Sequence, residues 1–146
     1  IWLPEFDEVI KWLQDNSGRG LFMHGDCGRG KTFIARYVMP SIILYSYRKV
    51  VKLYNSQDMN KKLDEILTKK LISLDDIGTE EVLVSYGNKR MALAEIVEGA
   101  EKAGKCLIIT TNLSKEQIID KYGERVYDRL IVLTRRIEFK GKSLRK

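Results

Sequence analysis

The sequence GDCGRGKT, at residues 25–32, decides the fold of this chain because it fits the phosphate-loop pattern GxxxxGK[ST]. It follows a short apolar run, Leu21–His24, and precedes a predicted helix over Lys31–Val38. Glycines let the backbone wrap around an anion, and the N-terminus of the following helix adds partial positive charge. Lys31 can reach the outer phosphates, and the Thr32 hydroxyl can bind Mg²⁺. We therefore expect a nucleoside triphosphate site rather than a simple glycine-rich turn.

This pattern gives the first set of candidate binding residues. Its backbone N–H groups can converge on the phosphates, and the first turn of the helix follows directly. We expect the nucleotide to be bound by Gly25, Asp26, Cys27, Gly28, Arg29, Gly30, Lys31, Thr32 and Phe33.

Two adjacent carboxylates follow the next apolar run. Leu71–Leu74 is predicted to be a buried strand, and Asp75 and Asp76 come directly after it. A carboxylate at a strand end beside the phosphate loop is placed to hold Mg²⁺, so we assign Asp75, with Thr32, to the metal. Asp76 would orient or deprotonate the attacking water as a general base. The alternative is a solvated pair at a turn. Because adjacent carboxylates repel, we expect the pKa of one to rise when Mg²⁺ is not bound.

Polar residues also follow a third predicted strand, Cys106–Ile109. Thr110, Thr111 and Asn112 come next, and the Asn112 amide could reach the γ-phosphate or the attacking water. Because Asn and Thr are also common turn residues, a helix-entry turn is an equal alternative.

Two arginines lie four residues apart near the C-terminal end. Arg125 and Arg129 would share one face of a short helix, with Glu124 and Asp128 beside them. An arginine inserted into a neighbouring subunit's nucleotide would neutralise charge on the transferred phosphoryl group. A solvated, salt-bridged helix face is the alternative.

Composition limits the class of protein. With 146 residues, of which 44% are hydrophobic, the chain has the size of one domain with a buried core. Strands alternate with helices, which favours an α/β fold with a parallel sheet covered on both faces. We expect no membrane partner, because no apolar run approaches the roughly 18 residues that cross a bilayer, and no signal peptide is visible. Two cysteines without metal-binding spacing indicate reduced thiols, so we expect a cytoplasmic protein.

The charge is basic and unevenly distributed. There are 26 Lys and Arg against 20 Asp and Glu, and the stretch 113–146 holds ten basic against five acidic residues. Three tyrosines also alternate with cations, a pattern that can stack bases and hold phosphates, although packing explains it as well. These residues are Tyr45, Tyr47, Arg48, Lys49, Lys52 and Tyr54.

Apolar spacing and capping signals predict the remaining elements. Pro40 is expected to end or kink the helix that starts at Lys31. Ser114 and Gln117 form a capping-box pattern. Helices are predicted over residues 4–13, 57–67 with Ser56 as the cap, 88–103, 114–119 and 124–130, and strands over 50–54 and 131–139, the last at a sheet edge.

Five segments together resemble one group of ATPases. They are GDCGRGKT at 25–32, LISLDDIG at 71–78, ITTNLS at 109–114, GERVYDRL at 123–130 and GKSLR at 141–145. The set resembles the ATPase domain of DnaC-type replicative helicase loaders, with the DnaI loaders and the IstB transposition ATPases as relatives. All of these belong to the AAA+ class.

The resemblance implies a P-loop NTPase fold of the AAA+ type, a five-stranded parallel sheet flanked by helices without a helical lid domain, over residues 1–146. Nothing in the chain corresponds to the N-terminal helicase-binding region of the loaders. It further implies ATP and Mg²⁺ as cofactors, Asn112 as the sensor I residue, and Arg129 as the leading arginine finger with Arg125 beside it. Its implied partners are a DnaB-type helicase, single-stranded DNA and further copies of the chain.

Several functions share these motifs. A slow, assembly-dependent ATPase of the helicase-loader type is the first expectation, and an IstB-like ATPase assisting a transposase has the same core. A small-molecule kinase would need a lid that closes over the phosphates, and no such segment is visible. A nucleotide-dependent binding module without turnover is the fourth alternative.

Overall fold

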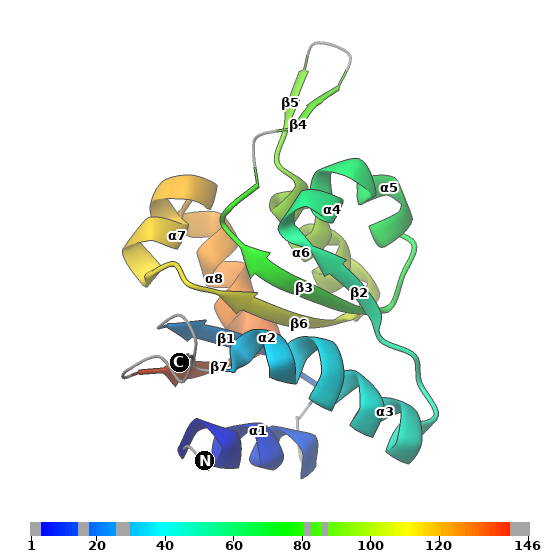
Figure 1. The fold of residues 1–146 in the computed structure, drawn as a ribbon. Coiled ribbons are helices and arrows are strands. Elements are labelled where there is room, and N and C mark those ends of the chain that lie inside the picture. The colour runs from blue at the N-terminus through cyan, green and yellow to red at the C-terminus, as the bar shows by residue number, and fades with distance from the viewer. Residues whose placement is uncertain (1–3, 15–17, 26–29, 81–82, 86–87, 141–146) are drawn as a thin grey trace.

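A computed structural model describes residues 4–14, 18–25, 30–80, 83–85 and 88–140, with only the backbone described at 83–85 and 88–90. Five parallel strands form one sheet in the order β2-β3-β6-β1-β7. They are β1 (Gly20–Gly25), β2 (Lys52–Asn55), β3 (Leu71–Ile77), β6 (Cys106–Thr111) and β7 (Thr134–Phe139). The predicted α/β fold with a five-stranded parallel sheet is confirmed (Figure 1).

Helices cover both faces of the sheet, as Figure 1 shows. One face carries α1 (Pro4–Gln14), α2 (Lys31–Phe33), the π-helical segment η1 (Ile34–Val38) and α3 (Met39–Tyr47). The other face carries α4 (Ser56–Lys61), α5 (Leu63–Ile66), α6 (Ala92–Ala103), α7 (Lys115–Tyr122) and α8 (Glu124–Leu133). A short antiparallel hairpin, β4 (Leu83–Ser85) and β5 (Asn88–Arg90), extends away from the sheet between β3 and α6.

The two faces form two separate hydrophobic clusters because side chains alternate along each strand. Phe22 of β1 packs with the helices α6 and α8, whereas its neighbours Leu21 and Met23 pack with α1 and α3. In β6, Ile109 and Ile108 divide between the clusters in the same way. Burial on both faces explains why these strands are continuous apolar runs in the sequence.

The expectation that Pro40 could end the helix is wrong. The helix that starts at Lys31 continues through Pro40 to Tyr47, and Pro40 lies in the first turn of α3. The preceding segment η1 has π-helical hydrogen bonding, in which the Met39 N–H group donates to the carbonyl group of Ile34. Proline removes one N–H donor and crowds the carbonyl four residues earlier, and a widened turn accommodates both effects.

Several element boundaries also differ from the prediction. The expected helix over 88–103 begins only at Ala92, because residues 88–90 pair with 83–85 as a β-hairpin. Helix α8 continues to Leu133, so the last strand begins at Thr134 rather than at residue 131. That strand does lie at an edge of the sheet, as expected from its interspersed charges.

The helix predicted over 57–67 is divided into α4 and α5 at Lys62. Its N-cap is Asn55, whose side chain accepts a hydrogen bond from the Asp58 N–H group, and Asp58 returns the interaction as a capping box. Ser56, the expected cap, is instead buried and its hydroxyl bonds to Thr79. Both residue types are good caps, so the sequence alone favoured neither.

Candidate functional site

The phosphate-loop candidates begin at the carboxyl end of β1. Gly25 ends that strand with φ +123°, and a Cβ atom there would lie 2.2 Å from the carbonyl oxygen of Phe139 on β7, so only glycine fits. Gly30 has φ +92° and directly precedes α2. The candidates Asp26, Cys27, Gly28 and Arg29 lie outside the described residues.

Lys31 is positioned at the start of α2 and points back toward the end of β1. Its side chain is buried, and Nζ donates a hydrogen bond of 3.1 Å to the carbonyl oxygen of Gly25. The same Nζ atom lies 6.0 Å from the centre of the Phe139 ring. Burying an ammonium group is unfavourable without partners, and an anion bound in the loop would add a strong one. Phe33, in contrast, is 61% exposed.

The two aspartates lie in an irregular part of β3 rather than after its end. Leu74 pairs with Ile109 of β6, and Ile77 pairs with Thr111. Three residue steps of β3 therefore oppose two steps of β6, so β3 carries one extra residue as a β-bulge at Asp75 and Asp76. A bulge redirects side chains locally, and here it does so at the position of both carboxylates.

Thr110 of β6 joins the two halves of this bulge. Its buried hydroxyl donates a hydrogen bond of 2.7 Å to Oδ1 of Asp75 and accepts one of 2.8 Å from the N–H group of Asp76. The sequence analysis included Thr110 only as part of a polar strand end and gave it no role. Threonine is common in strands, so the sequence carried no signal that would have distinguished it.

The predicted metal ligands are brought together. The Thr32 hydroxyl of α2 donates a hydrogen bond of 3.1 Å to Oδ1 of Asp75, the same oxygen that Thr110 contacts. A hydroxyl and a carboxylate at the phosphate loop are hard oxygen donors of the kind that Mg²⁺ prefers. The residues present therefore fit a magnesium ion that is also bound by phosphate oxygens.

Asp76 has unusual backbone and side-chain properties. Its φ of +58° is one of two positive values at non-glycine residues in the described chain, and Asp is among the residues that tolerate this region. Burial raises the pKa of the Asp76 carboxyl, and the charges of Asp75 and Glu80 raise it further, whereas Lys31 opposes the shift. The predicted rise in the pKa of one carboxylate is confirmed in direction, although burial is a larger cause than repulsion.

The turn after the bulge is fixed by Glu80, a residue that the sequence analysis missed. Its buried carboxylate accepts a hydrogen bond of 2.7 Å from the N–H group of Gly78 and one from the Tyr122 hydroxyl of α7. Lys121 donates to the carbonyl oxygen of Glu80 at 2.6 Å. Burial and the Glu80 hydrogen bond raise the pKa of Tyr122, so its hydroxyl stays a donor at neutral pH. The aspartate bulge is thereby tied to the helix that follows Asn112.

Asn112 is exposed and directly follows β6. The preceding Thr111 hydroxyl donates to the carbonyl oxygen of Ile77 at 2.7 Å and accepts from the N–H group of Leu113 at 3.1 Å. Asn112 therefore leaves the sheet at the same edge as the aspartate bulge. The Ser114–Gln117 capping box then starts α7, as predicted.

The two arginines lie on α8 and face α6 of the same chain. Nε of Arg129 lies 3.2 Å from the Glu101 carboxylate, and the Arg129 side chain is 28% exposed. Arg125 is exposed, and its charge and that of Arg129 contribute to the lowered pKa of Glu98, which Lys102 causes mainly. The salt-bridged helix face, one of the two alternatives, is thus what the single chain adopts at Arg129.

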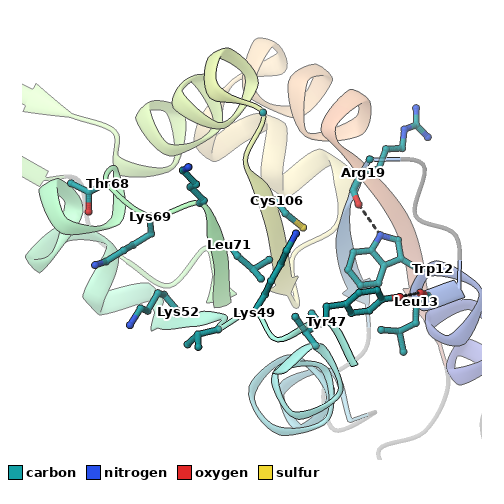
Figure 2. Close-up of a pocket in the computed structure, with 15 residues that line it drawn as sticks. Trp12, Leu13, Arg19, Tyr47, Lys49, Lys52, Thr68, Lys69, Leu71 and Cys106 are labelled. Atoms are coloured by element: carbon teal, nitrogen blue, oxygen red, sulfur yellow. Dashed lines mark hydrogen bonds between the residues drawn. The ribbon is translucent and has the colours of Figure 1, made fainter. Parts of the chain in front are cut away.

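A cavity of about 840 Å³ lies at the opposite edge of the sheet, where the strands begin (Figure 2). It is lined by residues from α1, α3 and the segments that enter β1, β2, β3 and β6. Of the predicted site residues that the structure describes, none lines it. Within the described ranges, no helix is long and apolar enough to cross a membrane.

Comparison with known proteins agrees with the motifs. The chain is 34% identical to the replicative helicase loader DnaI of Bacillus subtilis over 95 residues, which is 55% of this chain and 30% of DnaI. The chain thus spans about a third of this curated relative. This similarity confirms the resemblance to helicase-loader ATPase domains.

Solved structures confirm the fold. The DnaC helicase loader superposes with a TM-score of 0.78 at 19% identity, covering 95% of this chain and 92% of that one. DnaA from Aquifex aeolicus with bound AMPPCP gives a TM-score of 0.63 at 20% identity, covering 98% and 50%. The arrangement is thus a P-loop fold of the AAA+ type.

The strongest statement about identity comes from a family profile that covers nearly the whole chain. It is described as "Novel STAND NTPase 3" and matches residues 3–138. The sequence analysis anticipated an NTPase but not this particular description. The chain belongs to the Novel STAND NTPase 3 family.

Proposed function

We propose that residues 1–146 form an ATPase domain of the helicase-loader type that binds Mg²⁺ and ATP and hydrolyses ATP slowly. The observation that carries the proposal is the convergence of Thr32, Asp75, Thr110 and Asp76 beside the buried Lys31. The NTPase family and the AMPPCP bound to the structurally similar DnaA support the choice of ligand.

Each residue of this group has a role that follows from its position. Lys31 would exchange the Gly25 carbonyl for the outer phosphates, and Thr32 and Asp75 would hold the metal. Bound Mg²⁺ neutralises charge on the phosphates. Asp76 would accept the proton of the attacking water, with its carboxylate favoured by the approach of Lys31 and a metal. Asn112, at the same edge, would contact the γ-phosphate or the water.

The partners are proposed from the relatives. DnaI is a replicative helicase loader, and one structure of the similar fold is DnaA bound to AMPPCP and single-stranded DNA. We propose a DnaB-type helicase, bound through a region outside these residues, together with single-stranded DNA and further copies of the chain. The same relationship supports our proposal of a role in DNA replication in the cytoplasm.

A neighbouring copy would complete the site. Arg125 is exposed, and among the described residues Arg129 forms one ion pair, with Glu101, which is 51% exposed at its side chain. Exposed ion pairs contribute little stability, so the guanidinium can leave Glu101 for a more negative partner. Hydrolysis should therefore need assembly.

ATP turnover measured against protein concentration, with and without single-stranded DNA, tests this function. We expect turnover per chain to rise with concentration as neighbouring copies meet. Brisk turnover that is first order in protein and unchanged by Arg129→Ala would contradict it. Co-purification of the full-length protein with a replicative helicase, rather than with a transposase, would separate the loader from the transposition helper.

A further inference from the structure

The charged residues that line the cavity at the amino ends of the strands are of one sign. Five cationic residues line it, and no Asp or Glu is among the described residues that do so. The cations are Arg19, Lys49, Lys52, Lys69 and Lys70. Within the described ranges no carboxylate forms an ion pair with any of them.

The topology, rather than the local sequence, gathers these charges. Arg19 directly precedes β1, Lys49 and Lys52 lie where the chain enters β2, and Lys69 and Lys70 precede β3. The amino ends of parallel strands meet at one edge of the sheet, so residues about fifty positions apart come to line one cavity. Like charges that line one cavity, with no ion pair to a carboxylate among the described residues, favour an anionic ligand.

Most of the other lining residues are apolar or aromatic. Tyr47 is 54% exposed and its hydroxyl donates a hydrogen bond of 2.9 Å to the carbonyl oxygen of Leu13, which fixes the ring. The Trp12 indole N–H group donates hydrogen bonds to the carbonyl oxygens of Arg19 and Gly20, at 2.9 and 3.0 Å. Val50 is 59% exposed at the same cavity. Such a surface suits the planar face of a base. An inorganic anion would leave this apolar surface uncovered.

Figure 2 shows how the two kinds of lining are arranged. Trp12, Leu13 and Tyr47 lie at one end together with Arg19, and Lys52 and Lys69 lie at the other with Thr68. The Lys49 side chain reaches between the ends toward Cys106. A ligand with an apolar ring and a charged chain would place one part at each end. The volume of about 840 Å³ is within the range of small-molecule sites.

We propose that this cavity binds a nucleoside phosphate, as the free nucleotide or as part of a single-stranded oligonucleotide, at a site separate from the phosphate loop. The two sites lie at opposite ends of β1, which has six residues, and are thus roughly 17 Å apart at about 3.3 Å per residue. Binding at the cavity needs none of the phosphate-loop residues.

The test uses a Lys31→Ala background, in which the phosphate loop has lost its ammonium group. In that background we measure the affinities of a fluorescent oligothymidylate and of a fluorescent ATP analogue. The affinities are compared between the chain with Lys31→Ala alone and the chain that also carries Lys49→Glu/Lys69→Glu. The control, Lys61→Glu/Lys62→Glu, has the same charge change at exposed residues that do not line the cavity. We expect the cavity variant to bind about tenfold more weakly, with the control within about twofold.

Cys106 reports the location of binding, because it lines the cavity and is half-buried. With Cys27 replaced by Ser it is the remaining thiol, and its alkylation at alkaline pH is followed by mass spectrometry. Protection by ATP assigns the site to free nucleotide, and protection by the oligonucleotide alone assigns it to single-stranded nucleic acid. Either result supports the proposal.

Three results would overturn it. One is the absence of binding in the Lys31→Ala background, and another is an equal loss in the cavity and control variants. The third is equal protection of Cys106 by inorganic tripolyphosphate, which would remove the role of the base. If the glutamate variant unfolds, the Lys49→Gln/Lys69→Gln variant replaces it. Failure of the phosphate-loop site would be seen separately, because the unmodified chain and the Lys31→Ala variant would then bind ATP with equal affinity.

Discussion

The hydroxyl group of Thr110 donates a hydrogen bond of 2.7 Å to Oδ1 of Asp75. Thr110 is buried, with 1% of its surface exposed. The same hydroxyl accepts from the backbone N–H group of Asp76, so one side chain of β6 holds the carboxylate of Asp75 and the backbone of Asp76. Thr32 shares the Asp75 oxygen from the other side. The geometry of the proposed metal site thus depends on a residue that contacts neither phosphate nor metal.

Replacing Thr110 with Val should weaken both fold and activity. The variant keeps the shape of the side chain but leaves the Asp76 N–H group without its acceptor and removes one of the two hydroxyl donors to Oδ1 of Asp75, the other being Thr32. A buried group left unsatisfied costs about 1–3 kcal/mol. Urea unfolding should show a loss of this size, and the ATP turnover rate should fall at saturating nucleotide.

Thr110→Ser is the matched variant because it keeps the hydroxyl. It should recover most of the lost turnover, while losing some packing. Equal turnover in Thr110→Val and the original chain would show that the bulge does not need this hydroxyl.

The pH dependence of stability should follow from Asp76. Its folded-state pKa is raised, so over the pH range between the ordinary and the raised value the folded chain binds more protons than the unfolded chain. The contribution of this group to stability therefore falls as pH rises through that range. Asp76→Asn should remove the effect and raise the melting temperature at pH 8 in the absence of Mg²⁺, relative to the original chain.

Asparagine also tolerates the positive φ at this position, so the backbone should not oppose the change. The same variant should lose hydrolysis while retaining nucleotide binding. Melting curves from pH 4 to pH 8 on both chains make the comparison. A lower melting temperature for Asp76→Asn at pH 8 would contradict the assignment.

The role of Arg129 can be separated from its ion pair. Arg129→Ala and Glu101→Gln both remove the 3.2 Å contact, and each should change the free energy of unfolding by less than about 1 kcal/mol. If the guanidinium acts on a neighbouring copy, Arg129→Ala should lose concentration-dependent turnover and Glu101→Gln should keep or increase it. The measurement is turnover at several protein concentrations. Parallel losses in the two variants would assign Arg129 a structural role only.

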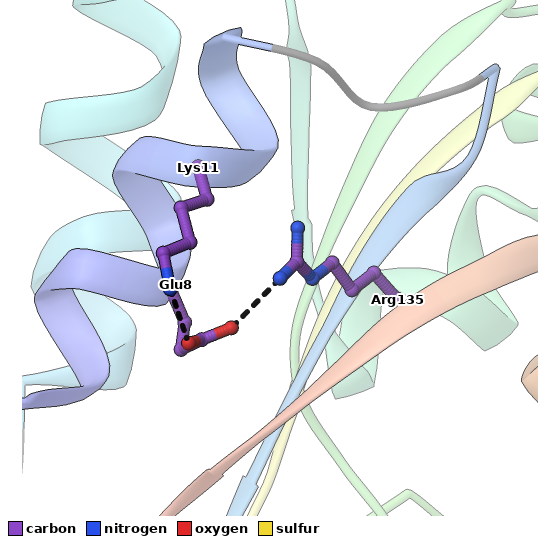
Figure 3. A network of polar contacts seen from close by, with 3 residues as sticks. All are labelled: Glu8, Lys11 and Arg135. Carbon is purple, nitrogen blue, oxygen red and sulfur yellow. Dashed lines mark hydrogen bonds and ion pairs between the residues drawn. The ribbon is translucent and has the colours of Figure 1, made fainter.

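The N-terminal helix should be held by packing rather than by charge. Figure 3 shows Glu8 of α1 between Lys11 and Arg135 of β7, at 3.4 and 2.8 Å. All three side chains are partly or largely exposed, so Glu8→Gln should cost less than about 1 kcal/mol. Trp12→Ala removes a 2% exposed indole and two hydrogen bonds and should cost about 3–5 kcal/mol.

Urea unfolding of both variants makes this comparison. A larger loss for Glu8→Gln than for Trp12→Ala would show that the ion pair, and not the indole, anchors α1.

The sequence was most informative where one segment determined both backbone and chemistry. The phosphate-loop pattern correctly placed a strand before it and a helix after it, and the apolar runs located the buried strands of the sheet. Helix α7 was predicted with its capping box because Ser114 and Gln117 lie three residues apart. The helix predicted to end at residue 103 does end there, and the following Gly104 has a left-handed conformation.

Features that depend on contacts between distant residues could not be predicted. The bulge at Asp75 and Asp76 depends on the register of β3 against β6, and the capture of Glu80 depends on α7. The helix continues through Pro40 by way of a π-helical turn, which is defined by its backbone hydrogen bonds and has no sequence pattern of its own. In the sequence the cations of the basic cavity are only one arginine and four lysines, divided among three connections.

The central claim is that the loop ending at Lys31 and Thr32 binds a nucleoside triphosphate with Mg²⁺. Isothermal calorimetry of the original chain and of Lys31→Ala, each titrated with ATP in the presence and absence of Mg²⁺, tests it most directly. We expect Mg²⁺-dependent binding by the original chain and at least about tenfold weaker binding by Lys31→Ala, a difference of about 1.4 kcal/mol. No Mg²⁺-dependent heat at millimolar ATP, or equal affinities in the two chains, would contradict it.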